Sequence, residues 1–116
     1  MTRKLTARTL LSALVLTSAM PLAAQAATKP ICIRTSEIDH TSTPDDRTIL
    51  FHMRHNKVWK NTLVNECAGL KNNANGFVYE PTKQVNGEIC ENFQSIILAD
   101  NGNTCLLGSF TEVSAR

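Results

Sequence analysis

The sequence lacks the motifs that mark most enzymes and nucleotide-binding proteins. It contains no G-x-S-x-G, no H-E-x-x-H and no C-x-x-C, and its five glycines are isolated, which excludes a glycine-rich phosphate loop. Neither sign of charge predominates, since the chain has 12 lysines and arginines and 10 aspartates and glutamates. With a net charge of only +2, the chain lacks the electrostatic footprint of a nucleic-acid-binding protein. We therefore predict no nucleic-acid partner, no cofactor and no metal ion.

Long apolar runs are absent except near the N-terminus, where the sequence is typical of a secretory signal peptide. Residues 1–8 carry three basic side chains, residues 9–19 are apolar and uncharged, and small residues follow up to Ala24-Gln25-Ala26. The apolar run is shorter than the roughly 20 residues that a transmembrane helix needs. We predict a signal peptide over residues 1–26, one domain over residues 27–116 without a transmembrane segment, and a periplasmic or secreted location.

Signal cleavage changes the charge balance of the chain. Residues 1–26 contain three basic residues and no acidic one, so residues 27–116 keep nine basic and ten acidic residues. A net charge this close to zero gives no strong electrostatic steering toward acidic or basic partners.

Four cysteines, all beyond the signal segment, predict two disulfides, because an even number in a small exported domain is typical of a disulfide framework. A tight hairpin at Asn101-Gly102 places Leu98 opposite Cys105. Cys90 precedes Leu98 by eight residues, so in an extended chain it lies on the order of 25 Å from Cys105. That distance is too long for a Cys90–Cys105 disulfide. Two pairings remain open. We favour Cys32–Cys105 with Cys67–Cys90, whose bridges do not cross, over Cys32–Cys90 with Cys67–Cys105.

Short apolar segments separated by turn residues predict an all-β domain with minor helical turns. Residues 32–38 form either a strand or one helical turn, whereas the polar residues 39–47 predict a loop. Five or six short strands favour a small disulfide-linked open barrel or sandwich. The other expected strands cover residues 48–54, 57–63, 77–80, 93–99 and 104–113.

A two-residue link at His55-Asn56 predicts a hairpin in which Met53 lies opposite Val58 and His52 opposite Trp59. Alternate residues of a strand point to opposite faces, so each face of this hairpin can be assigned. The face predicted to enter the core carries Ile49, Phe51, Met53 and Val58. The other face carries the candidate contact patch Leu50, His52 and Trp59.

The titratable residues give weak indications of chemistry. Asp45 and Asp46 are adjacent at a strand entry, and paired carboxylates can act as acid and base when their pKa values differ. Aspartates in loops more often accept hydrogen bonds from nearby backbone amides, which is the role we expect. The three histidines, His40, His52 and His55, fall in a loop, on a strand face and in a turn, so we do not expect them to come together as metal ligands.

Three short motifs within residues 32–110 carry a resemblance to a known group of proteins. They are C-I-x4-I from Cys32, D-D-R-T-I-L-F from Asp45 and T-C-x-L-G-x-F from Thr104. With these motifs the chain resembles a family of small exported proteobacterial proteins that is defined only as a domain of unknown function. The resemblance implies an envelope location and a shared cysteine framework, and it implies no activity, cofactor or catalytic residue.

The sequence predicts a non-enzymatic periplasmic or secreted module that binds an envelope protein or another periplasmic partner. Two alternatives stay open. The first is a small disulfide-stabilised inhibitor of a hydrolase, which inserts a rigid loop such as residues 71–76 into its target. The second is a small enzyme that uses Asp45, Asp46 and His52.

Overall fold

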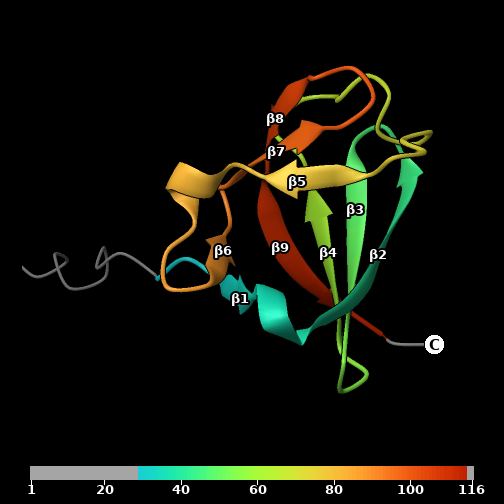
Figure 1. Ribbon diagram of the computed structural model, residues 1–116. Coiled ribbons are helices and arrows are strands. Elements are labelled where there is room, and N and C mark those ends of the chain that lie inside the picture. Colours follow the sequence, from blue (N-terminus) through green and yellow to red (C-terminus); the bar gives the residue numbers. More distant parts are fainter. Residues whose placement is uncertain (1–28, 115–116) are drawn as a thin grey trace, which may run out of the picture.

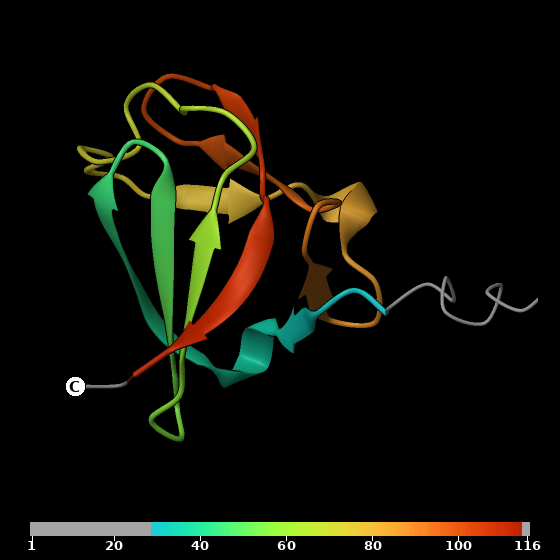
Figure 2. The same ribbon diagram turned by 180° about the vertical axis from the view of Figure 1, so that it is seen from behind.

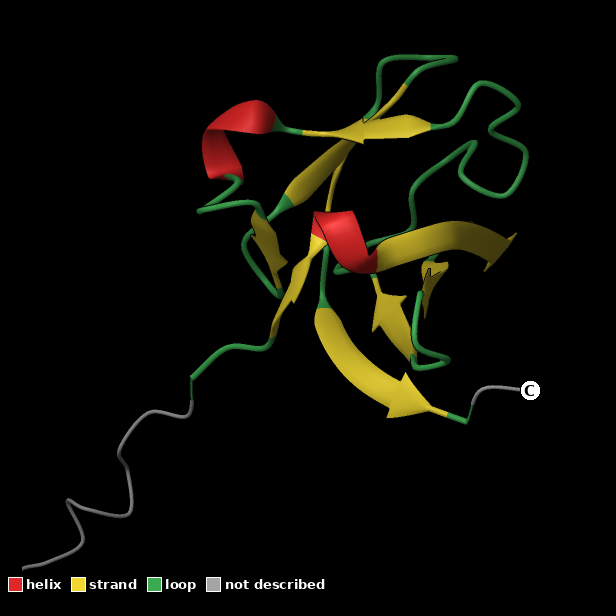
Figure 3. Cartoon of the chain, turned by 60° about the horizontal axis from the view of Figure 1, so that its bottom comes forward, coloured by secondary structure: helices red, strands yellow, loops and turns green. Residues whose placement is uncertain are grey.

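The computed structural model describes residues 29–114, which fold into nine short β-strands and two single 3-10 turns (Figure 1). The predicted all-β class is confirmed, with more strands than the five or six expected. The turns, red in Figure 3, are η2 (Thr35–Glu37) and η3 (Pro81–Lys83). Among these residues, no helix has the length and apolar character needed to cross a membrane. The predicted signal peptide lies outside the described residues.

The strands form three antiparallel sheets, none of them closed into a barrel. Figures 1 and 2 show β5 running across the strands of the four-stranded sheet, with the smallest sheet to one side. The largest sheet has the order β2 (Ile38–Asp45), β3 (Thr48–Met53), β4 (Val58–Thr62), β9 (Ser109–Val113). The second has the order β5 (Phe77–Tyr79), β7 (Ser95–Leu98), β8 (Thr104–Leu106), and the third pairs β1 (Cys32–Arg34) with β6 (Glu88–Cys90).

The core lies between these sheets and draws on each of them. Strand β3 buries every second residue, so Ile49, Phe51 and Met53 point inward as the alternating pattern predicts. Phe51 meets Phe110 of β9 edge to face, with ring centroids 5.6 Å apart. The remaining members of the core cluster are Ile33, Leu63, Cys67, Leu70, Ile89, Ile96, Leu98 and Leu107.

The register of the β3–β4 hairpin differs from the predicted one by one residue. Phe51 lies opposite Trp59, and His52 lies opposite Val58. The connection holds three residues rather than two, because the Met53 amide donates to the Lys57 carbonyl and Asn56 ends the turn with φ of 65°. A slip of one residue exchanges the faces of a strand. Trp59 therefore shares the face of Phe51, and Val58, although buried, shares that of His52.

Residues 39–47 were predicted as a loop, yet residues 38–45 form β2. The strand lies at a sheet edge with one half-buried face, so its alternation runs through threonines rather than large apolar residues. Two register shifts and Pro44 interrupt the strand, features that hinder a further strand from pairing with an edge. The segment 104–113 also departs from the prediction, because it breaks at Leu107-Gly108 into β8 and β9.

The two disulfides connect Cys32 with Cys90 and Cys67 with Cys105. The favoured pairing of Cys32 with Cys105 and Cys67 with Cys90 was wrong, whereas the exclusion of a Cys90–Cys105 bridge was right. The reason is that β1 pairs with β6, which makes Cys32 and Cys90 direct cross-strand partners. The turn around Gly102 is also two residues longer than predicted, so that Cys105 lies opposite Ile96.

A buried amide joins β4 to the point where the chain passes from β8 to β9. Asn61 is fully buried, its Nδ2 donates to the Gly108 carbonyl, and its Oδ1 accepts from the Gly108 amide, both at 2.8 Å. The backbones approach so closely that a Cβ on Gly108 would overlap the carbonyl oxygen of Thr62. Glycine is required here by the close approach itself.

Replacing Gly108 with Ala is expected to destabilise the fold by about 3 kcal/mol or more, because two strands must move apart. Gly87→Ala is the control, since its added Cβ meets open space and only its φ of +79° is unfavourable. That substitution should cost about 1–2 kcal/mol. Urea unfolding of both variants measures the difference, and equal losses would contradict the close approach at Gly108.

Removing the disulfides one at a time separates chain entropy from packing. The bridges span 58 and 38 residues, so the loop-entropy term is about 4 kcal/mol for each. Cys67 is 1% exposed and belongs to the core, whereas Cys32 is half-buried. In urea unfolding, the double variant C67A/C105A should therefore lose about 1 kcal/mol more than C32A/C90A. A larger loss for C32A/C90A would contradict this assignment.

Candidate functional site

A cleft of about 330 Å³ opens between β2 and β5, two strands that lie at the edges of their sheets. Thr41 and Thr43 of β2 form one wall, and Phe77 and Tyr79 of β5 form another. The loop that leads into β5 completes it with Asn73, Ala74 and Gly76. Three separate segments of the chain thus meet at a place where no strand fills the space between two sheets.

Strand alternation directs these side chains into the cleft. Thr41 and Thr43 are half-buried, whereas Ser42 between them is exposed. On β5, Val78 is 58% exposed between the two half-buried aromatic residues. The rings of Phe77 and Tyr79 meet edge to face with centroids 5.8 Å apart, so each ring limits the movement of the other.

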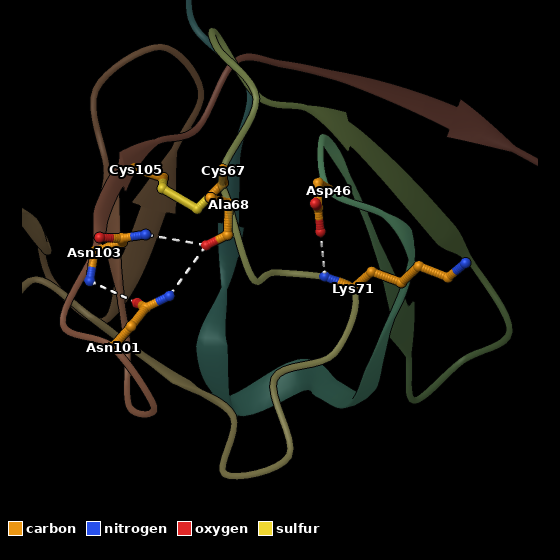
Figure 4. Close-up of a disulfide and its surroundings, with 7 residues drawn as sticks. All are labelled: Asp46, Cys67, Ala68, Lys71, Asn101, Asn103 and Cys105. Carbon is orange, nitrogen blue, oxygen red and sulfur yellow. Dashed lines mark hydrogen bonds between the residues drawn. A yellow bond between two sulfur atoms is a disulfide. The ribbon is translucent and has the colours of Figure 1, made fainter.

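The loop is anchored on two sides just before the residues that form the cleft wall (Figure 4). On one side, Oδ1 of Asp46 accepts from the Lys71 amide at 2.8 Å, and the Asp46 carbonyl accepts from the Cys67 amide. On the other side, the Cys67–Cys105 disulfide ties the loop to β8. The side-chain amides of Asn101 and Asn103 both donate through Nδ2 to the backbone carbonyl of Ala68. These contacts hold the loop in place before any ligand arrives.

The cleft lining is polar and carries no ionisable acid or base other than a tyrosine. Burial raises the pKa of Tyr79 to about 12, so its phenol stays neutral and keeps its proton at physiological pH. Within residues 29–114, the side chains of Thr41, Thr43, Asn73 and Tyr79 form no hydrogen bond with one another or with other groups. These hydroxyl and amide groups are free to pair with a ligand.

A second cluster lies on the outer face of the β2–β3 pair. His40 and His52 are cross-strand partners, and their rings stack with centroids 4.2 Å apart. Nδ1 of His40 lies 2.9 Å from a carboxylate oxygen of Asp39, and Nε2 of His52 lies 3.1 Å from the Ser42 hydroxyl. Burial, and then the nearby charge of His40, lower the pKa of His52. The hydrogen bond from His40 is the main cause of the lowered pKa of Asp39.

The contact of Ser42 with His52 brings a hydroxyl to an imidazole without the rest of a catalytic triad. A nucleophilic serine needs a base that a third group orients through its other ring nitrogen. The carboxylate of Asp39 bonds His40 instead of His52. Among residues 29–114, no group of three or more His, Cys, Asp or Glu side chains is arranged to hold a metal ion.

In the enzyme alternative, His52 lies apart from the adjacent aspartates Asp45 and Asp46. Asp45 pairs with Thr48, four residues before His52 on β3, a separation of about 13 Å along the strand. Oδ1 of Asp45 accepts from the Arg47 amide, which is the main cause of its lowered pKa. Asp46 accepts from the Lys71 amide. The backbone-bonding role expected for both aspartates is confirmed.

The predicted contact patch is divided between two faces. Leu50 and His52 lie on the outer face of β3, but the changed register places Trp59 on the face of the core. There its ring lies 6.1 Å from that of Phe110, and Nζ of Lys57 is 5.7 Å from the indole. Trp59 lines a separate groove with Ile33, Met53 and His55, among others.

The cleft residues were not among the predicted site residues. Assigning residues 39–47 to a loop hid the threonines of β2, and Asn73 lay in residues 71–76, which were named only as the inserting loop of the inhibitor alternative. The signals that could have found them are the alternations T-x-T at Thr41 and F-x-Y at Phe77, each of which places two similar side chains on one face of a strand.

No protein-family model, curated protein or solved structure matches this chain. Its functional interpretation therefore depends on the geometry of its own residues.

The lowered pKa of His52 predicts a loss of stability on acidification. The unfolded histidine takes up its proton near pH 6.5, whereas the folded one does so only at a lower pH. Stability is therefore highest above that value and falls between about pH 6.5 and the folded pKa. Thermal unfolding of the wild type at about pH 7.5 and about pH 5.5 should show a lower midpoint at the acidic pH.

His52→Gln should reduce this dependence on pH, because the titrating group is gone. His55→Gln is the matched control, since His55 lies in the turn, 3.5 Å from Glu37 and away from the histidine stack. If the two variants respond to pH alike, the stacked pair is not the cause of the acid sensitivity.

Proposed function

We propose that the protein is an exported, non-enzymatic binding module whose ligand enters the cleft between β2 and β5. The observation that carries this proposal is the set of uncommitted hydroxyl and amide groups beside two mutually supporting aromatic rings. The volume of the cleft, about 330 Å³, is in the range of small-molecule sites, and convergent polar groups are what orient a ligand in such a site. Because the loop wall is anchored by Asp46 and the Cys67–Cys105 disulfide, binding loses little conformational entropy.

The cell envelope or the medium is the compartment that fits this role. Two disulfides with no free cysteine among residues 29–114 fit an oxidising, non-cytoplasmic environment. The sequence of residues 1–26 supports export through a cleaved signal peptide. The same proposal places the chain among the small exported proteobacterial proteins that its motifs resemble, with an envelope component as its partner.

Blocking the cleft tests this function. Ala74 is exposed at the cleft wall, so Ala74→Arg adds bulk and charge to the cleft without disturbing the core. Ala68→Arg is the matched control, because Ala68 is an exposed alanine of the same loop that does not line the cleft. Binding to both the extracted and the insoluble fractions of the envelope should fall at least about tenfold for Ala74→Arg only. Equal binding by the wild type, Ala74→Arg and Ala68→Arg would contradict the proposal.

The inhibitor alternative retains one physical basis. Residues 71–76 form a series of tight turns, and Asp100 holds the loop through the backbone and side chain of Asn75. A loop fixed in this way resembles the rigid segments that insert into enzyme active sites at low entropic cost. Assays of peptidoglycan hydrolases and proteases with excess protein test this alternative, and full activity of every enzyme would exclude it for that panel.

A further inference from the structure

We infer that the ligand of the cleft between β2 and β5 is a neutral oligosaccharide. This inference rests on the proposed function and adds the chemical class of the ligand. It depends on three properties of the lining: its lack of charge, its balance of hydrogen-bonding groups, and its pair of aromatic rings.

The first property is electrical neutrality. None of the acidic or basic residues among residues 29–114 lines this cleft. By contrast, the groove beside Trp59 includes Arg34, Glu37, Lys57 and Glu88. A ligand with a phosphate or carboxylate would lose its hydration on entering the neutral cleft and would gain no opposite charge in return. The cleft therefore favours an uncharged ligand.

The second property is the kind of polar group present. The hydroxyls of Thr41, Thr43 and Tyr79 each donate and accept, and the amide of Asn73 has both a donor and an acceptor end. A ligand that matches them must also both donate and accept at closely spaced positions. The hydroxyl groups of a sugar meet this requirement, and a hydrocarbon or a lipid tail does not.

The third property is the aromatic wall. Phe77 and Tyr79 alternate with Val78 on β5, so their rings lie on the same side of an edge strand. Sugar rings expose faces of C–H groups between their hydroxyls, and the electron-rich face of an aromatic ring attracts such weakly positive hydrogens. The cleft thus offers an apolar surface and hydroxyl partners side by side, as a sugar ring does.

An extended peptide is the main competing ligand, and the edges beside the cleft disfavour it. A peptide that binds by strand addition needs a regular row of free backbone groups. Strand β2 has two register shifts and Pro44, which lacks an amide hydrogen. Strand β5 offers three residues before Glu80 and Pro81. Neither edge supplies a ladder long enough to hold a peptide firmly.

The test is a titration of the purified, oxidised protein, followed by amide NMR. The probes are neutral tetrasaccharides built from N-acetylglucosamine, glucose or galactose, a neutral threonine-rich peptide, and an anionic oligosaccharide. We expect a neutral tetrasaccharide to shift the amide signals of Thr41, Thr43, Asn73 and Tyr79. Thr43→Val keeps the shape of the side chain and removes its hydroxyl, so it should weaken this binding about fivefold. Thr111→Val, on an exposed face of β9, should leave binding unchanged.

Each other outcome overturns the inference in a recognisable way. Shifts at the cleft with the peptide or the anionic probe alone would show that the ligand class is wrong and that the cleft still binds. No shift with any probe, while Ala74→Arg still abolishes envelope binding, would also reject the sugar and retain the binding module. No shift with any probe and no effect of Ala74→Arg would reject both. Sugar shifts confined to another face would reject the site.

Discussion

The fold depends on one buried amide. Asn61 meets the amide and the carbonyl of Gly108 with its own side-chain groups, and so replaces a rung of backbone hydrogen bonds with a side chain. Gly108 is the residue at which the chain leaves the three-stranded sheet and enters the four-stranded one. Any movement there displaces β8 and β9 together. Because the group is fully buried, losing one partner leaves the other unpaired, at a cost of about 1–3 kcal/mol.

The position of the cleft follows from this junction. Strand β8 contains Cys105, whose disulfide fixes the loop that forms one wall of the cleft. Strand β7 pairs with β8 on one side and with β5 on the other, and β5 supplies the aromatic wall. Strand β9 pairs with β4, and through β4 and β3 the sheet extends to β2, which carries the threonine wall. The opposite walls thus belong to different sheets, and Asn61 with Gly108 fixes the junction through which the chain passes from one sheet to the other.

Local patterns predicted β3, β4, β5 and β7 but missed β2 and β6, and they predicted strand partners poorly. The alternation at Ile49, Phe51 and Met53 was enough to identify the core face of β3, because burial repeats with the period of a strand. The lengths of the turns between strands were predicted less accurately. One extra residue at the His55-Asn56 turn moved Trp59 to the opposite face, whereas two extra residues near Gly102 left Cys105 on the face of Leu98, its predicted partner. A register error of an odd number of residues moves a side chain to the opposite face of the sheet, whereas an error of an even number leaves it on the same face.

The cleft could not be predicted because its walls come together only in the tertiary structure. Nothing local in the sequence indicates that β1 pairs with β6, or that Thr41 and Tyr79 line one cavity. The same reason explains the disulfides: the pairing of Cys32 with Cys90 depends on a contact between strands 58 residues apart. A polar edge strand such as β2 also resembles a loop in composition, because five of its eight residues are exposed.

The two disulfides interleave along the chain, since Cys67 lies inside the loop closed by Cys32 and Cys90, and Cys105 lies outside it. A chain that emerges into an oxidising compartment from its N-terminus presents Cys32 and Cys67 first, and these two are not native partners. A bond formed at that moment must later be exchanged through attack by another thiolate. Correct oxidation therefore requires either that Cys32 and Cys67 stay reduced until Cys90 has emerged, or that exchange with a later cysteine or with an isomerase corrects the early bond.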